Sequence, residues 1–381
     1  MAEANQKLRR DLASSEYRID APARRFQPWH RPRKQHVRRI QIDGQLEPVL
    51  EEHEGPIRYL GMPGSDLLDL RWIHNGMCER LGRKLLFIGF DIGSDEDQTR
   101  LSIEAAKLGM SGVDERSDII PTEFQSLADA DSVAYQKAMR IGSFDLVNID
   151  LCNGVATEAP SASVDTMYNA IANLIGLQVA RTIPWLLMLT TRIDRANVNK
   201  HAAQQLAAIV DSNISNCSEF ERAIQLAYGQ QHRSYRTLVG ISAATVAQLR
   251  AVGIAKWIIQ LAAAKQMPAS LVSAETYTVS PLSGHPDLLS MAFRIEPAVR
   301  SPATDRFGLA TETNGMHEID ECGAAVAALE ALHTAADVDT LLNQDPALFQ
   351  QARAESADLL VQAGYDRQRY FDWLDNQMAV A

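Results

Sequence analysis

The sequence predicts an α/β protein built around an open, mostly parallel β-sheet. Short, almost continuous apolar runs at residues 84–90, 144–150 and 185–191 have the length and composition of parallel strands that are buried on both faces. Segments with helical periodicity separate these runs. Two further strands, at residues 274–279 and 288–295, follow one another closely, which predicts an antiparallel hairpin that closes the sheet.

Length and composition exclude several classes of protein. The chain has 381 residues, of which 46% are hydrophobic and 22% charged, so it is neither fibrous nor disordered as a whole. The longest apolar stretches, such as residues 183–190 and 254–264, are shorter than the ~20 residues that span a bilayer. The amino terminus has no apolar core typical of a secretory signal. We therefore expect a cytoplasmic protein that does not enter the membrane.

The cysteines and histidines show no pattern typical of a metal site. Cys78, Cys152, Cys217 and Cys322 lie far apart and form no CxxC pair. This spacing predicts neither a zinc ribbon nor a disulfide framework, so we expect reduced thiols. The histidines share no spacing that would place them on a common ion, and we predict no metal site.

Charge is unevenly distributed along the chain. The net charge is −11, yet residues 1–40 contain eleven basic and four acidic side chains. Residues 1–50 are therefore interpreted as a basic amino-terminal arm, which either contacts a polyanion such as a nucleic acid or folds onto its own acidic body. Within it, two prolines favour an extended backbone over residues 26–39. Phe26 and Trp29 would stack on bases or anchor the arm to the body.

Strand and helix alternate through the middle of the chain. The first strand is expected at residues 57–61, followed by a turn in which Ser65 caps the next helix. Because parallel strands need crossover connections, this order predicts helices on both faces of the sheet. The predicted helices and helical stretches are 66–81, 98–108, 132–139, 163–180 and 197–266.

The carboxyl-terminal part differs in composition. From residue 321 it is rich in alanine and leucine and contains ten acidic but only three basic side chains. We interpret residues 301–381 as an acidic helical appendage, a candidate surface for a protein partner. Its predicted helices are 322–332, 336–343, 346–363 and 367–378.

Three strand ends carry the candidate site. In open α/β sheets, ligands bind beyond the carboxyl ends of the strands, where loops and helix termini present free N–H groups. The corresponding segments here are residues 60–65, 90–91 and 148–154. Their order and spacing resemble the class I S-adenosylmethionine-dependent methyltransferases, and the resemblance covers roughly residues 57–295. It implies a Rossmann-like domain over residues 51–300.

The resemblance also implies roles for five residues. Gly61 and Gly64 would lie against the methionine part of S-adenosylmethionine, and Asp91 would hold its ribose hydroxyls. Asp150 and Asn153 would orient the acceptor by hydrogen bonds. The implied function is methyl transfer to a nucleic acid, RNA or DNA, with the basic arm contacting phosphates.

Departures from the family pattern leave alternatives open. The first loop has G-x-x-G in place of G-x-G-x-G, and Tyr59 stands where the preceding strand usually has an acid. A catalytically inactive methyltransferase-like binding or scaffold subunit is therefore the competing hypothesis. Cys152 is either a nucleophile, as in RNA cytosine-C5 methyltransferases, or an ordinary buried residue. A nicotinamide enzyme is disfavoured because G-x-G-x-x-G is absent.

Overall fold

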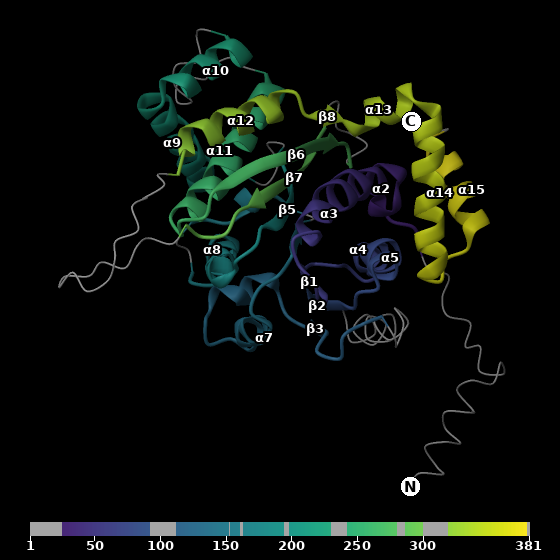
Figure 1. The fold of residues 1–381 in the computed structure, drawn as a ribbon. Helices are drawn as coiled ribbons and strands as arrows, with labels where there is room; N and C mark the ends of the chain where they lie inside the picture. Colours follow the sequence, from purple (N-terminus) through teal and green to yellow (C-terminus); the bar gives the residue numbers. More distant parts are fainter. Residues whose placement is uncertain are drawn as a thin grey trace, which may run out of the picture.

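The protein has an α/β fold with one mixed β-sheet (Figure 1). The structure is a computed structural model. It describes residues 25–91, 112–151, 153–160, 163–193, 198–229, 242–279, 286–299 and 319–378. The expected fold class is confirmed at this level, since most strands are parallel and the antiparallel pairing involves the late strands.

Eight strands form the sheet within the described residues, in the order β3-β2-β1-β4-β5-β7-β6-β8. Only β7 runs antiparallel to its neighbours, β5 and β6, which confirms the predicted hairpin. The strands are β1 (Ile57–Gly61), β2 (Leu85–Phe90), β3 (Asp118–Ile120), β4 (Leu146–Asp150), β5 (Trp185–Arg192), β6 (Ala269–Tyr277), β7 (Leu288–Ile295) and β8 (Ala336–Asp337).

The strand order reverses direction between β1 and β4. The chain runs outward from β1 through β2 to β3 and then returns to place β4 on the other side of β1. Connections leave the two strands in opposite directions along the sheet, so a crevice opens at their carboxyl ends. This reversal is the topological switch point of the sheet.

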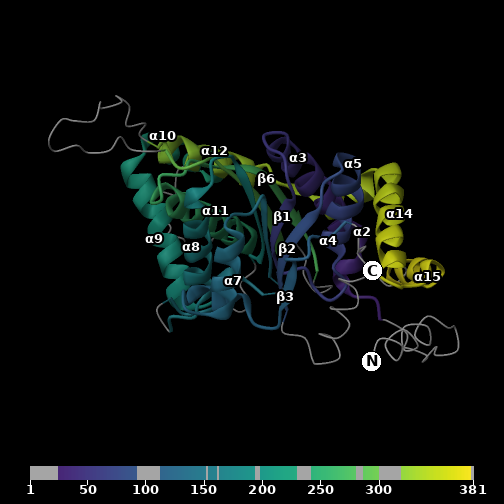
Figure 2. The same cartoon turned by 60° about the horizontal axis from the view of Figure 1, so that its bottom comes forward.

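Helices cover both faces of the sheet (Figure 2). Most of the predicted helices are present, with small shifts at their ends, whereas the one expected at residues 98–108 lies outside the described residues. The α-helices are α2 (Pro32–Arg38), α3 (Gly44–Leu50), α4 (Leu68–Ile73), α5 (Glu79–Leu81), α7 (Val133–Ile141), α8 (Met167–Leu177), α9 (Lys200–Asn216), α10 (Ser218–Tyr228), α11 (Ala243–Ala263), α12 (Glu321–His333), α13 (Val338–Gln344), α14 (Pro346–Gln362) and α15 (Arg367–Met378).

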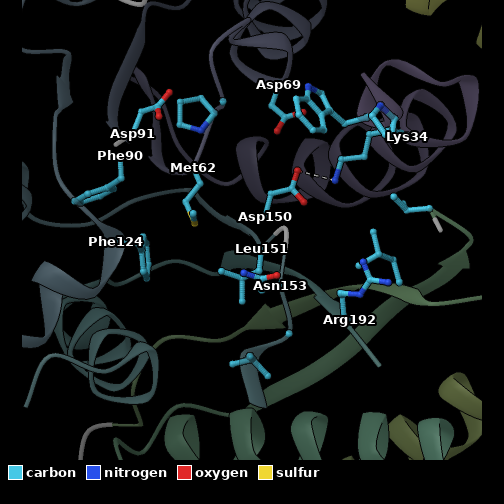
Figure 3. A pocket seen from close by; sticks show the side chains of 18 of the residues that line it. Lys34, Met62, Asp69, Phe90, Asp91, Phe124, Asp150, Leu151, Asn153 and Arg192 are labelled. Atoms are coloured by element: carbon cyan, nitrogen blue, oxygen red, sulfur yellow. Dashed lines mark ion pairs between the residues drawn. The ribbon is translucent and has the colours of Figure 1, made fainter. Parts of the chain in front are cut away.

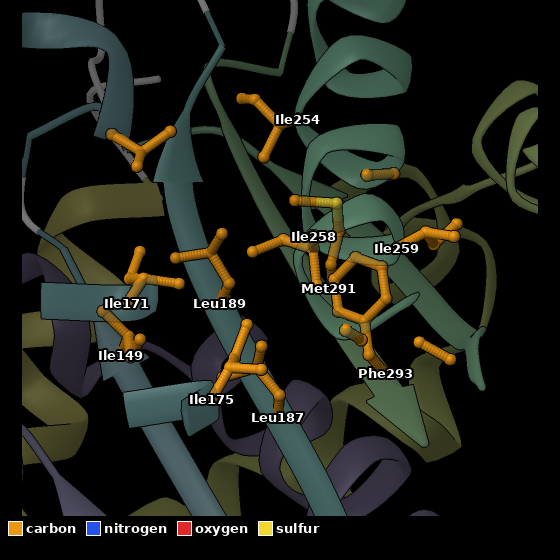
Figure 4. Packing of buried hydrophobic residues seen from close by; sticks show 14 of the residues in the cluster. Ile149, Ile171, Ile175, Leu187, Leu189, Ile254, Ile258, Ile259, Met291 and Phe293 are labelled. Atoms are coloured by element: carbon orange, nitrogen blue, oxygen red, sulfur yellow. The ribbon is translucent and has the colours of Figure 1, made fainter. Parts of the chain in front are cut away.

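Successive side chains of the central strands point to opposite faces of the sheet and belong to two separate hydrophobic cores. In β5, Leu187 and Leu189 pack with α8 and α11 on one face, whereas Leu186 and Met188 belong to the cluster under α3 and α4. Figure 4 shows the first core, where Ile258 of α11 lies opposite Leu189. This two-sided burial explains why the strands are almost continuously apolar in sequence.

Helix α11 is the longest helix within the described residues. Its segment Ala244–Ala263 is long and apolar enough to cross a membrane, by length and composition alone. However, 72% of the relevant window is buried inside the protein, as in the core helix of a soluble fold. Its neighbours α9 and α12 pack against it.

Residues 26–39 do not have the extended backbone predicted for them. They form a short 3-10 helix, Pro28–His30, and the helix α2. Pro28 and Pro32 occupy the first turns of these two elements, where a missing N–H costs nothing and the fixed φ angle favours helix. The prolines therefore begin helices here, and the segment packs against the body.

Two cysteines expected to be separate thiols form a disulfide. Cys217 and Cys322 are 105 positions apart in sequence, and their Cα atoms lie 5.8 Å apart. The expectation of reduced thiols is wrong for this pair because the folding of α12 against α10 brings the two residues together. Cys78 is free and buried, whereas Cys152 lies outside the described residues.

A buried ion cluster lies at the amino ends of the strands. The Asp145 side chain is fully buried, and its Oδ1 lies 2.7 Å from His53 Nε2 and 2.5 Å from Arg181 Nη2. Its Oδ2 accepts a 2.7 Å hydrogen bond from the Arg58 backbone N–H. Burial raises the pKa of Asp145, but the contacts with His53 and Arg181 outweigh this effect and leave the pKa below its usual value.

We predict that Asp145→Asn lowers the free energy of unfolding by about 3–5 kcal/mol at pH 7, because Arg181 loses its buried counter-ion. The folded-state pKa lies below the unfolded one, so the stabilisation is present above pH ~4 and is lost as the pH falls through the folded pKa. Urea unfolding at several pH values measures both effects. Asp375→Asn, which removes an exposed partner of Arg353, is the control and should change stability by less than about 0.5 kcal/mol. Equal losses in the two variants would contradict this account.

Candidate functional site

A cavity of about 590 Å³ opens at the carboxyl ends of the central strands (Figure 3). Four of the five predicted site residues line it, namely Gly64, Asp91, Asp150 and Asn153. Asp150 is the last residue of β4, and the other three lie in the loops that follow β1, β2 and β4, so the topology brings them together from separate segments. The size is in the range of pockets that hold a small molecule or cofactor.

Gly61 does not line the cavity. It is the last residue of β1, and a Cβ atom there would clash with the backbone carbonyl of Asn148 in β4. Its role in the structure is to let the two strands approach at the switch point. Gly64 has a φ angle of +65°, which glycine adopts without strain, and it lies in the loop above the cavity.

The loop after β1 ends differently from the expectation. Ser65 does not cap the following helix, because α4 begins at Leu68 and its N-cap residue is Leu67. Leu67 has a φ angle of +52°, an unfavourable conformation for a branched side chain, and it is fully buried. Buried contacts of the loop therefore hold the strained residue in place.

One end of the cavity is aromatic and acidic. The rings of Phe90 and Phe124 meet edge to face, with their centroids 5.3 Å apart. Met62 and Asp91 lie at the same end in Figure 3. This combination suits a flat, partly apolar group that also presents hydroxyls to a carboxylate.

The opposite end is built around an ion pair. Asp150 Oδ2 lies 2.8 Å from Lys34 Nζ, and the Lys34 side chain is only 9% exposed. Burial lowers the pKa of Lys34, but Asp150, Tyr277 and Asp69 together outweigh this effect, and the pKa stays above its usual value. Lys34 is therefore a fixed cation and not a base. Arg192 also faces this end, held by a 2.8 Å contact with the buried Asp287 (Figure 3).

A second buried ion pair forms the floor at the switch point. Arg38 Nε donates to Asp69 Oδ1 at 2.5 Å, and Asn148 Nδ2 donates to Asp69 Oδ2 at 2.9 Å. Asp69 belongs to α4 and is almost completely buried. Asp69 therefore places a carboxylate near the carboxyl end of β1. Within β1 itself, Tyr59 stands at the position where the methyltransferase pattern usually has an acid. Burial raises the pKa of the Tyr59 hydroxyl well above its usual value, so this group stays neutral.

Sequence reasoning missed the residues contributed by the amino-terminal segment. Trp29, Arg33, Lys34 and Arg38 all line the cavity. The three cations among them pair with acids elsewhere in the chain: Arg33 with Asp339, Lys34 with Asp150 and Arg38 with Asp69. The sequence does contain one indication of these ion pairs, because a basic segment precedes a chain that is acidic overall. Folding of the arm onto its own body, one of the two interpretations left open, describes residues 25–50.

The carboxyl-terminal helices hold this segment in place. Asp66 Oδ2 accepts hydrogen bonds from His30 Nε2 and from the Tyr365 hydroxyl, each at 3.1 Å. The Tyr370 hydroxyl donates to the His30 carbonyl at 2.8 Å. Phe26 packs among the rings of Tyr365, Tyr370 and Trp373, as expected for an anchor. Asp66, in the loop after β1, thus contacts both the amino-terminal segment and the carboxyl-terminal helices.

We predict that the double variant Tyr365→Phe with Tyr370→Phe speeds amide hydrogen exchange in residues 25–50, because two buried hydrogen bonds to the segment and its anchor are lost. Hydrogen exchange followed by mass spectrometry measures the change. Tyr168→Phe, which removes a hydroxyl contact to the Glu158 carbonyl on the far side of the sheet, is the control. Unchanged exchange in residues 25–50 of the double variant would contradict this anchoring role.

Comparison with known proteins identifies a family. None of the curated proteins compared with the chain matches it. The sequence profile of the PP_RS20740-like family matches residues 23–375, which include the amino-terminal segment, the sheet and the carboxyl-terminal helices. The description of that family names no activity. The chain belongs to the PP_RS20740-like family.

Proposed function

We propose that the protein transfers a methyl group from S-adenosylmethionine. The observation that carries the proposal is the meeting of Gly64, Asp91, Asp150 and Asn153 around one cavity. These residues come from the carboxyl ends of β1, β2 and β4, at residues 61, 90 and 150. The topology brings them together at the switch point, where ligands bind in open α/β sheets.

The strand order supports the proposal. The sequence β3-β2-β1-β4-β5 matches the order of the Rossmann-type dinucleotide-binding sheets, which bind their ligands where the order reverses. The antiparallel pairing of β7 with β5 and β6 agrees with the antiparallel hairpin that the methyltransferase resemblance implies, although β8 adds a further strand beyond β6. The cavity lies at the reversal, next to β1 and β4.

The residues present fit the cofactor chemically. Asp91 would accept hydrogen bonds from the ribose hydroxyls, and Phe90 and Phe124 would pack against the adenine. Six carboxylates and four cationic side chains line the cavity, so it favours a ligand with a net positive charge. The carboxylates belong to Asp66, Asp69, Asp91, Glu123, Asp150 and Glu158, and the cations are Arg33, Lys34, Arg38 and Arg192.

When bound, S-adenosylmethionine supplies an electrophilic methyl group on a sulfonium. The carboxylate of Asp150 would accept the proton that the acceptor loses, and Asn153 would fix the acceptor by its amide. Lys34 would hold the carboxylate of Asp150 in place through their ion pair. Positioning of the two reactants in one cavity would supply much of the rate.

A nucleic acid remains the acceptor that we propose. Within the described part of the amino-terminal segment, Arg33, Lys34, Arg38 and Arg39 contact acids of the chain, so phosphate binding would rely on other cations. Five basic residues at positions 7–24 lie outside the described residues. Trp29, which is 45% exposed at the cavity wall, would stack on a base.

A non-catalytic binding subunit is the second candidate. The observation that favours it is the neutralisation of two cavity carboxylates by the chain itself: Lys34 holds Asp150, and Arg38 holds Asp69. A protein whose cavity binds a ligand without turnover would tolerate these contacts.

We predict that the protein binds S-adenosylhomocysteine with micromolar affinity and that Asp91→Ala weakens binding about 10–100-fold, because the carboxylate's hydrogen bonds are lost. Isothermal titration calorimetry measures both values. Asp118→Asn is the matched control, since Asp118 lies on β3 and pairs with Lys137 outside the cavity. A parent protein without affinity for S-adenosylhomocysteine or S-adenosylmethionine would refute the proposed function.

Methyl transfer itself separates the two candidates. We predict that the parent transfers labelled methyl groups to RNA or DNA and that Asp150→Asn lowers the rate by about 10²-fold or more, while cofactor affinity changes little. Scintillation counting of separate RNA, DNA and small-molecule pools gives the readout. Cofactor binding without transfer to any pool would favour the binding subunit, and full activity of Asp150→Asn would contradict the role given to this residue.

A further inference from the structure

Three metal-ligating side chains meet on the helical side of the molecule, away from the cavity. They are Cys217, Glu219 and Cys322, and one ligand atom from each lies within 4.8 Å of the others. None of the three lines the cavity. The cluster joins the start of α10 to the start of α12.

The local structure explains why the groups converge. Cys217 is the N-cap residue of α10, where its Sγ accepts from the Phe220 N–H at 3.3 Å. Cys322 follows Asp320, the N-cap of α12, whose carboxylate accepts from the Gly323 N–H at 2.7 Å. Two helix amino termini therefore point at one spot, and their positive ends favour negatively charged sulfur and oxygen ligands.

The distances to Glu219 suit a shared ion. Glu219 Oε2 lies 4.0 Å from Cys217 Sγ and 3.7 Å from Cys322 Sγ. Two ligands on one tetrahedral zinc ion, at ~2.3 Å for sulfur and ~2.0 Å for oxygen, are about 3.5 Å apart. The carboxylate is thus already near its position, and the two sulfur atoms need only separate from their disulfide.

We propose that Cys217, Glu219 and Cys322 form a zinc site in the reduced protein and that oxidation converts this site into the disulfide. Reduction of the disulfide by two thiol molecules gives two protein thiols and one small-molecule disulfide. Zinc then binds both sulfur atoms as thiolates and releases two protons, with water in the fourth position. In the reverse direction, glutathione disulfide oxidises the two thiolates and takes up two protons to become two glutathione molecules, and the ion is released.

The two states hold the same elements together by different bonds. In either state α12 stays fixed to the junction of α9 and α10, and α12 leads directly into β8 at the sheet edge. Sequence spacing did not indicate the site, because Cys217 and Cys322 are 105 positions apart.

Cobalt(II) absorbance tests the proposal on the full chain. The fully reduced parent should bind one Co²⁺ per chain with a sulfur-to-cobalt charge-transfer band, and added Zn²⁺ should remove the band. Cys217→Ser and Cys322→Ser should abolish the band. Glutathione disulfide should remove it from the parent, with release of the ion and loss of two titratable thiols. A reduced parent without the band overturns the proposal.

Two further variants keep the result independent of folding. Glu219→Gln keeps both thiols and changes a side chain that is 59% exposed, so the fold should be intact while the affinity for Co²⁺ falls at least tenfold. Cys78→Ser is the matched control at a free cysteine outside the cluster and should retain the band. Unchanged affinity in Glu219→Gln, or loss of the band in Cys78→Ser, would overturn the three-ligand site.

Discussion

The candidate site depends on two ion pairs, one buried and one partly buried, that join the amino-terminal segment to Asp69 of α4 and to Asp150 at the end of β4. Arg38 with Asp69 and Lys34 with Asp150 bring four charges into a largely buried region. Buried charges are costly unless each has a partner and further hydrogen bonds. The segment is therefore held in one position, because displacement would leave Asp69 without its cationic partner in a buried environment.

These pairs connect the charge distribution of the chain to its architecture. The cations of the amino-terminal segment pair with carboxylates near the switch point of the sheet. Residues of the same segment line one side of the cavity. The carboxyl-terminal helices complete the arrangement through Tyr365 and Tyr370. The first described residues and the ends of the strands thus line the cavity, whereas the last helices hold the amino-terminal segment in place. The matched family profile spans all three parts.

The central strands of the sheet were predictable from sequence because burial on both faces requires continuous apolar runs, such as residues 85–90. The short strands β3 and β8 were not predicted, and residues 336–337, which form β8, were expected to begin a helix. The strand-end residues Asp91 and Asp150 were predictable from the position of those runs. Contacts between distant positions were not: Lys34 and Asp150 are separated by more than 100 positions, and no local pattern encodes their pairing. The prolines at 28 and 32 misled the prediction, since the same residue favours extended chain before it and helix after it. The disulfide was not predicted for the same reason, because Cys217 and Cys322 are 105 positions apart and no local pattern indicates that they meet.

A crystal structure of the protein grown with S-adenosylhomocysteine tests the central claim most directly. The account predicts density in the cavity, with the ribose hydroxyls within hydrogen-bonding distance of Asp91 and the adenine packed against Phe124. The Lys34–Asp150 pair should lie at the end where the methyl group would be presented. Density for the ligand at any other place, or an empty cavity at saturating ligand, would contradict the account.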